Sequence, residues 1–432
     1  MKIEDLHQLF IESKGIATDT RKIQRGQLFF ALKGDNFNGN QFAAQALIKS
    51  ESFAVVDEAE FAIDDKFILV NDVLKTLQDL ASFHRNYLKI PILAITGSNG
   101  KTTSKELINA VLKRKFDTVA TEGNLNNHIG VPLTLLSMKT STDFGIVEMG
   151  ANHPGEIRAL CDIAQPDYGY ITNFGKAHLE GFGSVEGVIR AKSELYDHLK
   201  RNEKLLFLNI DDPIQKTHTI YSSVFTFGNN EKADVKVEYP ATTKTAEVRF
   251  NGNLYSSILT GNYNAVNIAA AISIGTYFKV PYETISKAIA SYTPKNNRSQ
   301  IVKIGNNTLL MDAYNANPTS MQAALGSFNS YPVENKWVIL GDMFELGESS
   351  KTEHQDIASI VEGMNLEKAV LVGSNFYDVK ITNEKALKFK DFKDLENFLR
   401  TSPPENCHIL VKGSRGMALE RVQDVIKGVS RS

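Results

Sequence analysis

The residues that most directly suggest chemistry form a short glycine-containing loop, 97-GSNGKTT-103. The common phosphate-binding loop follows G-x-x-x-x-G-K-T/S, which would require glycine where this chain has Ile95. The loop nevertheless follows the apolar run 91-PILAIT-96 and precedes a helical pattern, the context in which free N–H groups at a helix start bind an anion. We therefore predict phosphate binding, with a glycine-rich turn carrying an incidental lysine as the alternative.

Each residue type in this loop suits a particular task. Gly97 and Gly100 would permit tight turns and close approach of a phosphate. Lys101 would bring a full positive charge to the β- and γ-phosphates, and the Thr102 hydroxyl would bind Mg²⁺. The predicted nucleotide-binding set from this loop is Gly97, Ser98, Asn99, Gly100, Lys101, Thr102 and Thr103.

Three other side chains are expected at the same edge of the sheet. Glu148 ends one predicted strand, His178 follows the next, and Lys192 lies in the helix after it. Because ligands of an open parallel sheet bind beyond the carboxyl ends of its strands, these groups should converge on the loop. With Thr102, they would form a set of Mg²⁺ ligands. Taken singly, they could also be a surface strand end, a loop histidine and a solvated lysine.

The elements that would position these residues form three α/β segments. Residues 1–89 mix short strands and turns, and residues 90–294 alternate apolar strands with helices. A polar cluster at 291–300 separates this part from a further α/β unit at 295–432, whose last helix is predicted from about 416 to 427. Strands that are apolar throughout predict a parallel sheet covered on both faces. We predict a small N-terminal α/β domain, a central phosphate-loop domain and a Rossmann-like C-terminal domain.

Composition excludes several classes of protein. With 432 residues, 48 basic and 50 acidic side chains, the net charge of −2 argues against a general nucleic-acid binder. The acidic start MKIEDLHQLFIESKG does not resemble a signal peptide, and no apolar run approaches the roughly 18 residues of a membrane span. Cys161 and Cys407 fit no metal or redox spacing and are expected to be reduced thiols. We expect a soluble, cytoplasmic monomer.

Longer motifs resemble the Mur ligase family of ATP-dependent amide-forming enzymes. They occur in order along nearly the whole chain: TGSNGKTT, 123-GNLNNHIGVPLTLL-136, VEMGANHPGEI, AHLEGFGS, AKSELY and GNYNAVNIAAA. The family has the shorter loop G-x-x-G-K-T/S, which accounts for Ile95.

Other stretches narrow the resemblance within the family. The segments 312-DAYNANPTSM-321, 340-LGDMFELGESSKTEH-354 and 412-KGSRGMALE-420 resemble the members that join D-alanyl-D-alanine to UDP-MurNAc-tripeptide. The D-N-P-R motif of the ligases that add the third amino acid is not found. The N-terminal 18-TDTRKIQRGQLFFALKGDNFNG-39 resembles the uridine-nucleotide-binding domain of both groups.

The resemblance implies a reaction and a catalytic set. ATP would phosphorylate the terminal carboxylate of the tripeptide, and the amine of D-alanyl-D-alanine would attack the acyl phosphate, in the last cytoplasmic step of peptidoglycan precursor synthesis. Lys101, His178 and Lys192 would be catalytic. One Mg²⁺ would bind Thr102 and Glu148, and a second would lie near His178 and a carbamylated Lys192.

The resemblance also implies more distant contacts. Asn264 and Asn267 would face adenine, while Arg298 and Asp312 would reach ATP when the C-terminal domain closes. The predicted substrate-binding set is Asp19, Thr20, Arg21, Asn126, Asn127 and Asn315. A surface salt bridge for Arg21, and a helix-cap and turn role for Asp312 and Asn315, are the alternatives. For the whole chain, the rival readings are another Mur ligase, a folylpolyglutamate synthase, or a non-catalytic nucleotide-binding switch.

Overall fold

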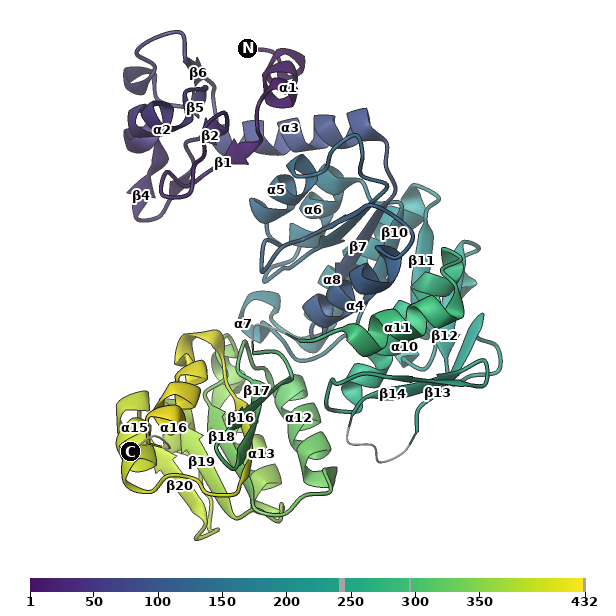
Figure 1. Cartoon of the computed structure of the whole chain (residues 1–432), viewed down its shortest axis with the longest axis vertical. Helices are drawn as coiled ribbons and strands as arrows, with labels where there is room; N and C mark the ends of the chain where they lie inside the picture. Colours follow the sequence, from purple (N-terminus) through teal and green to yellow (C-terminus); the bar gives the residue numbers. More distant parts are fainter. Residues whose placement is uncertain (241–244, 295–296, 430–432) are drawn as a thin grey trace.

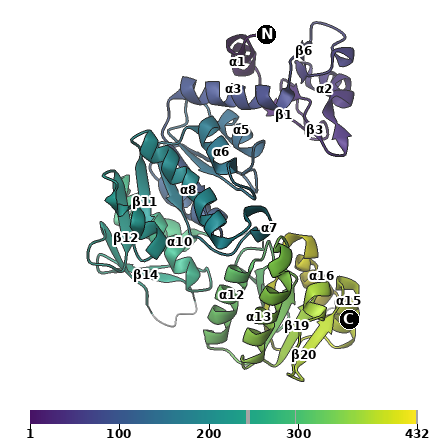
Figure 2. The ribbon, with the colours of Figure 1, turned by 180° about the vertical axis from the view of Figure 1, so that it is seen from behind.

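The computed structural model describes residues 1–240, 245–294 and 297–429, which form three α/β bodies in succession (Figures 1 and 2). The N-terminal body holds a parallel four-stranded sheet of order β1-β2-β5-β6 and a separate hairpin, β3–β4. Its elements are α1 (Ile3–Glu12), β1 (Ile16–Ala17), β2 (Leu28–Phe30), β3 (Lys33–Gly34), β4 (Phe37–Asn38), η1 (Gly39–Phe42), α2 (Ala43–Ser50), β5 (Ala54–Val56), η2 (Ala59–Phe61) and β6 (Phe67–Leu69).

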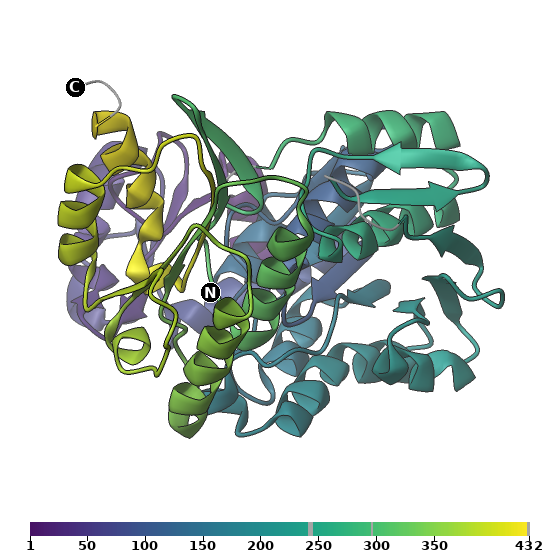
Figure 3. The same ribbon diagram turned by 90° about the horizontal axis from the view of Figure 1, so that it is seen from below.

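The central body is built on a nine-stranded sheet of order β15-β14-β13-β12-β11-β10-β7-β9-β8. The strands from β13 to β8 are parallel, and β14 and β15 add an antiparallel hairpin. The strands are β7 (Ile92–Thr96), β8 (Thr118–Ala120), β9 (Phe144–Glu148), β10 (Tyr168–Ile171), β11 (Leu205–Asn209), β12 (Val224–Gly228), β13 (Val235–Glu238), β14 (Glu247–Phe250) and β15 (Asn253–Ser256). In the view from below, this hairpin and the C-terminal helix lie at opposite ends of the molecule (Figure 3).

Helices cover both faces of the central sheet, because both sides of each central strand are apolar. Along β7, Ile92 and Ala94 face one hydrophobic cluster, whereas Leu93 and Ile95 face the other. The first face is covered by α5 (Gly130–Leu136), α6 (Glu156–Ala164) and α8 (Val185–Arg201), and the second by α4 (Lys101–Leu112), α10 (Tyr263–Tyr277) and α11 (Tyr282–Ser291). Short helices α7 (Leu179–Phe182), α9 (Pro213–Lys216) and η3 (Thr217–Ile220) complete this body.

The C-terminal body is a six-stranded sheet of order β16-β17-β21-β18-β19-β20, antiparallel only between β16 and β17. Its strands are β16 (Gln300–Ile304), β17 (Asn307–Asp312), β18 (Lys336–Gly341), β19 (Lys368–Val372), β20 (Ala386–Phe389) and β21 (His408–Lys412). Its helices are α12 (Pro318–Ser330), η4 (Gly347–Ser349), α13 (Ser350–Glu362), α14 (Ser374–Tyr377), α15 (Phe392–Thr401), η5 (Arg415–Met417), η6 (Leu419–Arg421) and α16 (Val422–Val429). The α/β fold class and the Rossmann-like C-terminal part are confirmed.

The last helix differs from its prediction. The expected helix from about 416 to 427 is broken into two 3₁₀ turns and the shorter α16, since Ala418 adopts a left-handed conformation with φ +48°. An interrupted turn of this kind cannot be read from apolar spacing. The predicted boundary between the second and third domains falls at residues 295–296, which lie outside the described residues.

Helix α3 (Val73–Leu88) joins the N-terminal and central bodies (Figure 1). Its N-cap Asp72 accepts a hydrogen bond from Lys75 N, while Arg85 at its other end pairs with Asp167 of the central body at 2.7 Å. One hydrophobic cluster passes through all three bodies, from Leu6 and Val55 through Leu80 and Val147 to Leu340. Among the described residues, no helix combines the length and apolarity needed to cross a bilayer.

Two histidines are buried where α1 and α3 meet the central body. His7 Nε2 lies 3.0 Å from His84 Nδ1, and His84 Nε2 lies 3.0 Å from the carbonyl oxygen of Met138. A carbonyl only accepts, so His84 Nε2 is the donor to Met138, and the Nδ1 of neutral His84 accepts from His7. Burial lowers the pKa of both imidazoles, and at His7 the neighbouring His84 lowers the pKa further.

Candidate active site

The phosphate loop joins β7 to α4 and tolerates only glycine at two places. Gly97 has φ +139°, and a Cβ there would lie 2.0 Å from Thr172 Oγ1. Gly100 caps α4 with φ +78°, and its Cβ would lie 2.8 Å from Asn267 Oδ1. Both the backbone conformation and the close approach therefore require glycine. The first N–H groups of α4 are left facing the loop, as an anion site requires.

The loop is fixed against the segment that follows β10. Ser98 Oγ donates to Gly175 O at 2.9 Å, and Asn99 N donates to Asn173 Oδ1 at 3.1 Å. Thr103 lies half-buried in the first turn of α4. The predicted loop residues therefore form one structural unit with the neighbouring strand end.

Lys101 is the cation of this loop. Its Nζ donates to Gly97 O at 2.7 Å, so the ammonium lies against the loop backbone. Burial lowers the pKa of Lys101, nearby Glu148 opposes that shift, and the positive charge of Arg298 adds to it. Arg298 belongs to the C-terminal body and is expected to reach ATP. Its charge already acts on Lys101 of the loop.

Thr102 and Glu148 form a buried oxygen pair. The Thr102 hydroxyl donates to the Glu148 carboxylate at 2.9 Å, and Asn126 Nδ2 donates to the same carboxylate at 2.8 Å. Glu148, at the end of β9, is only 1% exposed. A hydroxyl and a carboxylate are hard oxygen ligands and fit Mg²⁺. Within the described part of the chain, no group of three or more His, Cys, Asp or Glu side chains is placed to hold a metal.

Lys192 of α8 is buried beside this edge, 1% exposed. Its Nζ donates to the carbonyl of Ala151 at 3.2 Å and lies 5.2 Å from the centre of the Phe182 ring. Burial holds the pKa of Lys192 well below its usual value, and the charge of Lys101 lowers it further. The positive charge of the half-buried Lys101 therefore disfavours a charge on the buried Lys192 unless an anion is present.

His178 lies against the C-terminal body. It caps α7 with a left-handed backbone, φ +51°, and its Nδ1 contacts the carboxylate of Glu345, whose own φ is +60°. This hydrogen bond lowers the pKa of Glu345. The metal-ligand role predicted for His178 stays a prediction, and Glu345 is a partner that the sequence did not reveal, although it lies within the LGDMFELG segment.

Asn264 and Asn267 form a buried network behind the phosphate loop. Asn267 Nδ2 donates to Asn264 Oδ1 at 2.9 Å, and Ser104 Oγ donates to Asn267 Oδ1 at 3.0 Å. Asn264 Nδ2 donates to Thr260 O at 2.7 Å. These bonds hold the Asn267 side chain against Gly100, so the two asparagines have a structural role. Their contact with adenine stays a prediction.

The C-terminal body contributes a second strand edge that faces the loop. Asp312, at the end of β17, accepts from Lys412 Nζ at 2.6 Å and from Ser299 N at 3.2 Å. Asn315 is exposed, and its Oδ1 accepts from the following N–H of Ala316. Lys412 begins the KGSRGMALE segment, and the sequence alone gives it no role. Its burial beside Asp312 depends on the fold.

Comparison with known proteins agrees with this geometry. Residues 95–275 match the Mur ligase middle domain, and residues 297–415 match the Mur ligase, glutamate ligase domain. The UDP-N-acetylmuramoyl-tripeptide--D-alanyl-D-alanine ligase of Bacillus subtilis (strain 168) is 33% identical over 427 residues, covering 96% of this chain and 93% of that protein. The chain belongs to the Mur ligase family.

Solved structures agree with this assignment. Crystal structure I of MurF from Acinetobacter baumannii superposes with a TM-score of 0.84 at 29% identity, covering 98% of each chain. MurF ligase from Thermotoga maritima in complex with ADP gives a TM-score of 0.85 at 26% identity, covering 100% of this chain and 99% of that chain. The chain therefore has the three-domain Mur ligase architecture.

The N-terminal residues of this Mur ligase lie far along the chain from the loop and pair locally. Arg21 is exposed and forms a two-pronged contact with Asp19 in the same turn, which lowers the pKa of Asp19 to about 2. The Thr20 carbonyl accepts from Lys49 at 2.9 Å. The salt-bridge alternative for Arg21 is thus observed, and its predicted contact with the nucleotide-sugar stays a prediction.

Asn127 has a local task in this Mur ligase. Its Oδ1 accepts from Ile129 N at 3.1 Å and from Gly130 N at 2.9 Å, which starts helix α5. The carbonyl end of its side chain is therefore already used. Asn126, by contrast, donates its amide to Glu148 and lies beside the Thr102–Glu148 pair.

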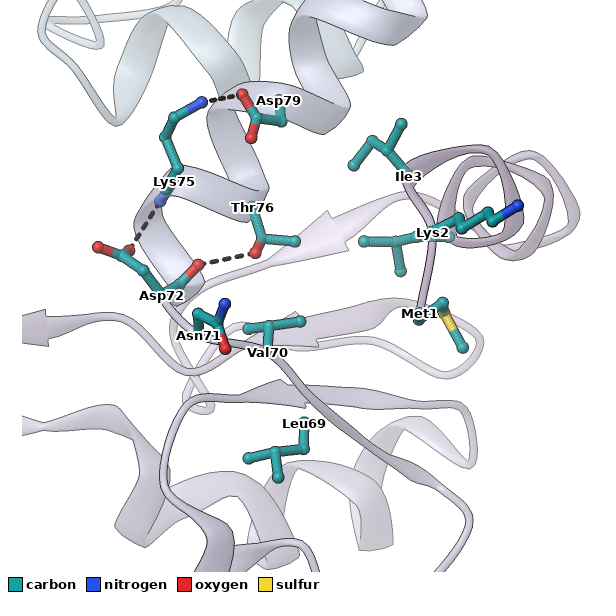
Figure 4. A pocket seen from close by; sticks show the side chains of 11 residues that line it. Met1, Lys2, Ile3, Leu69, Val70, Asn71, Asp72, Lys75, Thr76 and Asp79 are labelled. Atoms are coloured by element: carbon teal, nitrogen blue, oxygen red, sulfur yellow. Dashed lines mark hydrogen bonds and ion pairs between the residues drawn. The ribbon is translucent and has the colours of Figure 1, made fainter.

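A cavity of about 350 Å³ lies in the N-terminal body between the starts of α1 and α3 (Figure 4). Hydrogen bonds from Lys75 and Thr76 to Asp72, and the Lys75–Asp79 pair, form one wall. None of the predicted site residues lines it. Its lining is Met1, Lys2, Ile3, Leu6, Leu69, Val70, Asn71, Asp72, Lys75, Thr76 and Asp79.

Proposed function

We propose that this Mur ligase uses ATP to join D-alanyl-D-alanine to UDP-MurNAc-tripeptide, forming an amide through an acyl phosphate. The observation that carries this proposal is the buried Thr102–Glu148 oxygen pair beside the loop cation Lys101 at one strand edge, with the buried Lys192 bonded to Ala151 just after the same strand. Such a cluster suits a reaction that must bring two anions, a γ-phosphate and a carboxylate, into contact. The Bacillus subtilis relative bears the name of this activity.

Lys101 and the α4 amides would bind the β- and γ-phosphates of ATP. The ammonium leaves the Gly97 carbonyl for a phosphate oxygen, which offsets the charge that builds on the transferred group. Thr102 and Glu148 would hold Mg²⁺, which supplies Lewis-acid neutralisation of phosphate charge when bound. Asn126 fixes the orientation of the Glu148 carboxylate.

Lys192 would act as a carbamate. Because its pKa is lowered, Lys192 has a neutral amine that can form an N–C bond with CO₂ and release one N–H proton to solvent. The carbamate is an anion, and its charge offsets the positive charge of Lys101. His178 would complete this side of the site. The carbamate and a second metal ion are part of the proposal.

Docking of the C-terminal body would bring the acceptor and exclude water from the acyl phosphate. Lys176 N donates to Thr319 Oγ1 at 2.9 Å and its Nζ pairs with Glu353 at 2.6 Å, which supports such docking. We propose domains at residues 1–89, 90–294 and 295–432, a monomer, and a cytoplasmic location where ATP and the UDP-linked precursor are available.

Phosphate release tests the function. The purified chain should release phosphate from ATP only when UDP-MurNAc-tripeptide and D-alanyl-D-alanine are both present, with one amide product for each phosphate. Release with a single amino acid in place of the dipeptide would favour another Mur ligase or a folylpolyglutamate synthase. ATP binding with no ligation, unchanged by His178→Ala and Lys192→Ala, would favour a nucleotide-binding switch.

A further inference from the structure

The acceptor dipeptide poses a charge problem that the central body does not solve. This inference rests on the proposed function. The dipeptide has an amine that must reach the acyl phosphate and a carboxylate at its other end. Because phosphate and carboxylate charge already gathers at the loop, the carboxylate of the acceptor needs a separate cation. Two extended residues span at most about 7 Å, so that cation must lie close to the ATP side.

Two lysines at the facing edge are already paired with carboxylates. Lys412 is 2% exposed and donates to Asp312 Oδ2 at 2.6 Å and to Asn315 O at 3.3 Å. Lys176 pairs with Glu353 across the interface at 2.6 Å. These lysines hold the architecture together and are poor candidates for an incoming carboxylate.

Two arginines share one aromatic ring at this edge. The guanidinium carbon of Arg298 lies 3.7 Å from the centre of the Tyr314 ring, and that of Arg415 lies 5.7 Å from it. Tyr314 follows β17 and Arg415 follows its parallel neighbour β21, while Arg298 precedes β16, which is antiparallel to β17. The topology therefore places all three at the carboxyl edge of the sheet, where ligands bind.

The two arginines differ in where their charge acts. Arg298 stacks on Tyr314 at 3.7 Å and is the arginine expected to reach ATP, so we assign it to the ATP side. Arg415 has a side chain that is 61% exposed, and its Nη1 donates to Glu420 at 3.0 Å. A guanidinium has five donors in a planar fork that matches a carboxylate, so this contact leaves Arg415 able to bind one.

The loop that carries Arg415 is well anchored. Ser414 Oγ accepts from Phe344 N at 2.9 Å and donates to Ala316 O at 3.3 Å, which ties three strand ends together. A Cβ on Gly413 would lie 3.0 Å from the Gly341 Cα, so the strands approach closely here. Arg415 thus projects from a fixed base rather than from a free loop.

We propose that Arg415 binds the C-terminal carboxylate of the acceptor dipeptide, beside the Tyr314 ring on which Arg298 stacks. The two guanidinium carbons can be no farther apart than the sum of their distances to the shared ring centre. One dipeptide can therefore extend from the ATP side to Arg415, with its amine at the acyl phosphate. The charge at Arg415 selects an acceptor that ends in a free carboxylate.

The test compares D-alanyl-D-alanine with its C-terminal amide in wild type and in Arg415→Gln. In wild type, the amide should raise the KM for acceptor by about tenfold to a hundredfold, the size expected for one charge-assisted contact. Arg415→Gln should raise the KM for the acid by a similar factor, leave the KM for ATP and for UDP-MurNAc-tripeptide within about twofold, and show no further loss with the amide. Arg415→Lys should lie between, because lysine keeps the charge without the fork.

Arg400→Gln is the matched control. Arg400 is an exposed arginine of the same body that pairs with Glu396 at 2.6 Å on α15. It should keep the wild-type ratio of acid to amide. An equal ratio in wild type and Arg415→Gln would overturn the inference alone, whereas absence of dipeptide ligation by the wild type would overturn the proposed function and the inference with it.

Discussion

Asn317 of the C-terminal body donates its side-chain amide to the Asn99 side-chain oxygen in the phosphate loop, at 2.7 Å. The oxygen of the same Asn317 side chain caps α12 by accepting from Ser320 N at 2.9 Å. One side chain thus starts a helix in one body and reaches the nucleotide loop of another. We therefore expect the position of the phosphate loop to be coupled to the placement of the C-terminal body.

Substitution of Asn317 should separate these two tasks. Asn317→Ser keeps a capping oxygen but is too short to reach Asn99, so stability should change by less than about 0.5 kcal/mol while the central and C-terminal bodies separate more often. Fluorescence energy transfer between dyes on the two bodies measures this. Asn317→Ala should in addition lower the free energy of unfolding by about 1 kcal/mol. Identical transfer distributions in wild type and Asn317→Ser would contradict the link.

Glu148→Gln tests whether the Thr102–Glu148 pair holds Mg²⁺. The amide keeps one oxygen for the Thr102 hydroxyl but loses the negative charge, so the concentration of Mg²⁺ needed for half-maximal activity should rise by at least about tenfold. The free energy of unfolding measured with EDTA should change little, because size is preserved. An unchanged Mg²⁺ dependence would show that Glu148 does not hold the ion.

If Lys192 acts as a carbamate, the ligase activity should depend on CO₂. Because burial lowers the pKa of its ammonium, the neutral amine is present near neutral pH and can react. Enzyme prepared in CO₂-free buffer should lose activity and regain it with bicarbonate, and gentle intact-mass measurement should show the added mass of one CO₂. Lys192→Arg, which cannot form the carbamate, should be inactive in both buffers. Full activity without CO₂ and an unmodified mass would refute carbamylation.

The His7–His84 pair should make the N-terminal junction sensitive to acid. The folded-state pKa of each is lowered, so above the unfolded value of about 6.5 neither state binds the proton and stability is full. As the pH falls through that value, the unfolded chain binds protons that the folded chain does not bind, and the free energy of unfolding decreases.

Urea unfolding between pH 8 and pH 5 measures this effect. His7→Gln keeps an amide that can donate to His84 but does not titrate, so its stability should fall less steeply than that of wild type. The other buried histidines with lowered pKa, such as His354, remain in both proteins and cancel in the comparison. Parallel pH profiles for the two proteins would mean that His7 does not contribute.

The features predicted most accurately from the sequence are those that depend on the order of a few neighbouring residues. The strand ending at Thr96, the turn at Gly97 and Gly100, and the start of α4 at Lys101 follow from an apolar run and glycine chemistry, and all are present. Glu148 was placed beside Thr102 because parallel strands share an edge, a rule that needs no long-range detail.

Contacts between bodies could not be predicted in this way. The pairing of His178 with Glu345 depends on how two separately folded sheets dock, which apolar spacing does not encode. Within the C-terminal body, Tyr314 and Arg415 are distant in sequence and come near each other because β17 and β21 are neighbours, which apolar spacing does not encode either. Asn127 shows a second limit, since its oxygen starts a helix and the substrate contact expected of it stays a prediction.

The hydrophobic cluster that runs from Leu6 to Leu340 has a consequence for how the chain unfolds. Domains with separate cores melt independently, each with its own midpoint. Here α3 and the helices that face it contribute to one continuous apolar interior. Unfolding of the N-terminal sheet therefore also exposes apolar side chains of the central body to water. Calorimetry should therefore show fewer transitions than the three sheets suggest, with the N-terminal and central bodies melting as one cooperative unit.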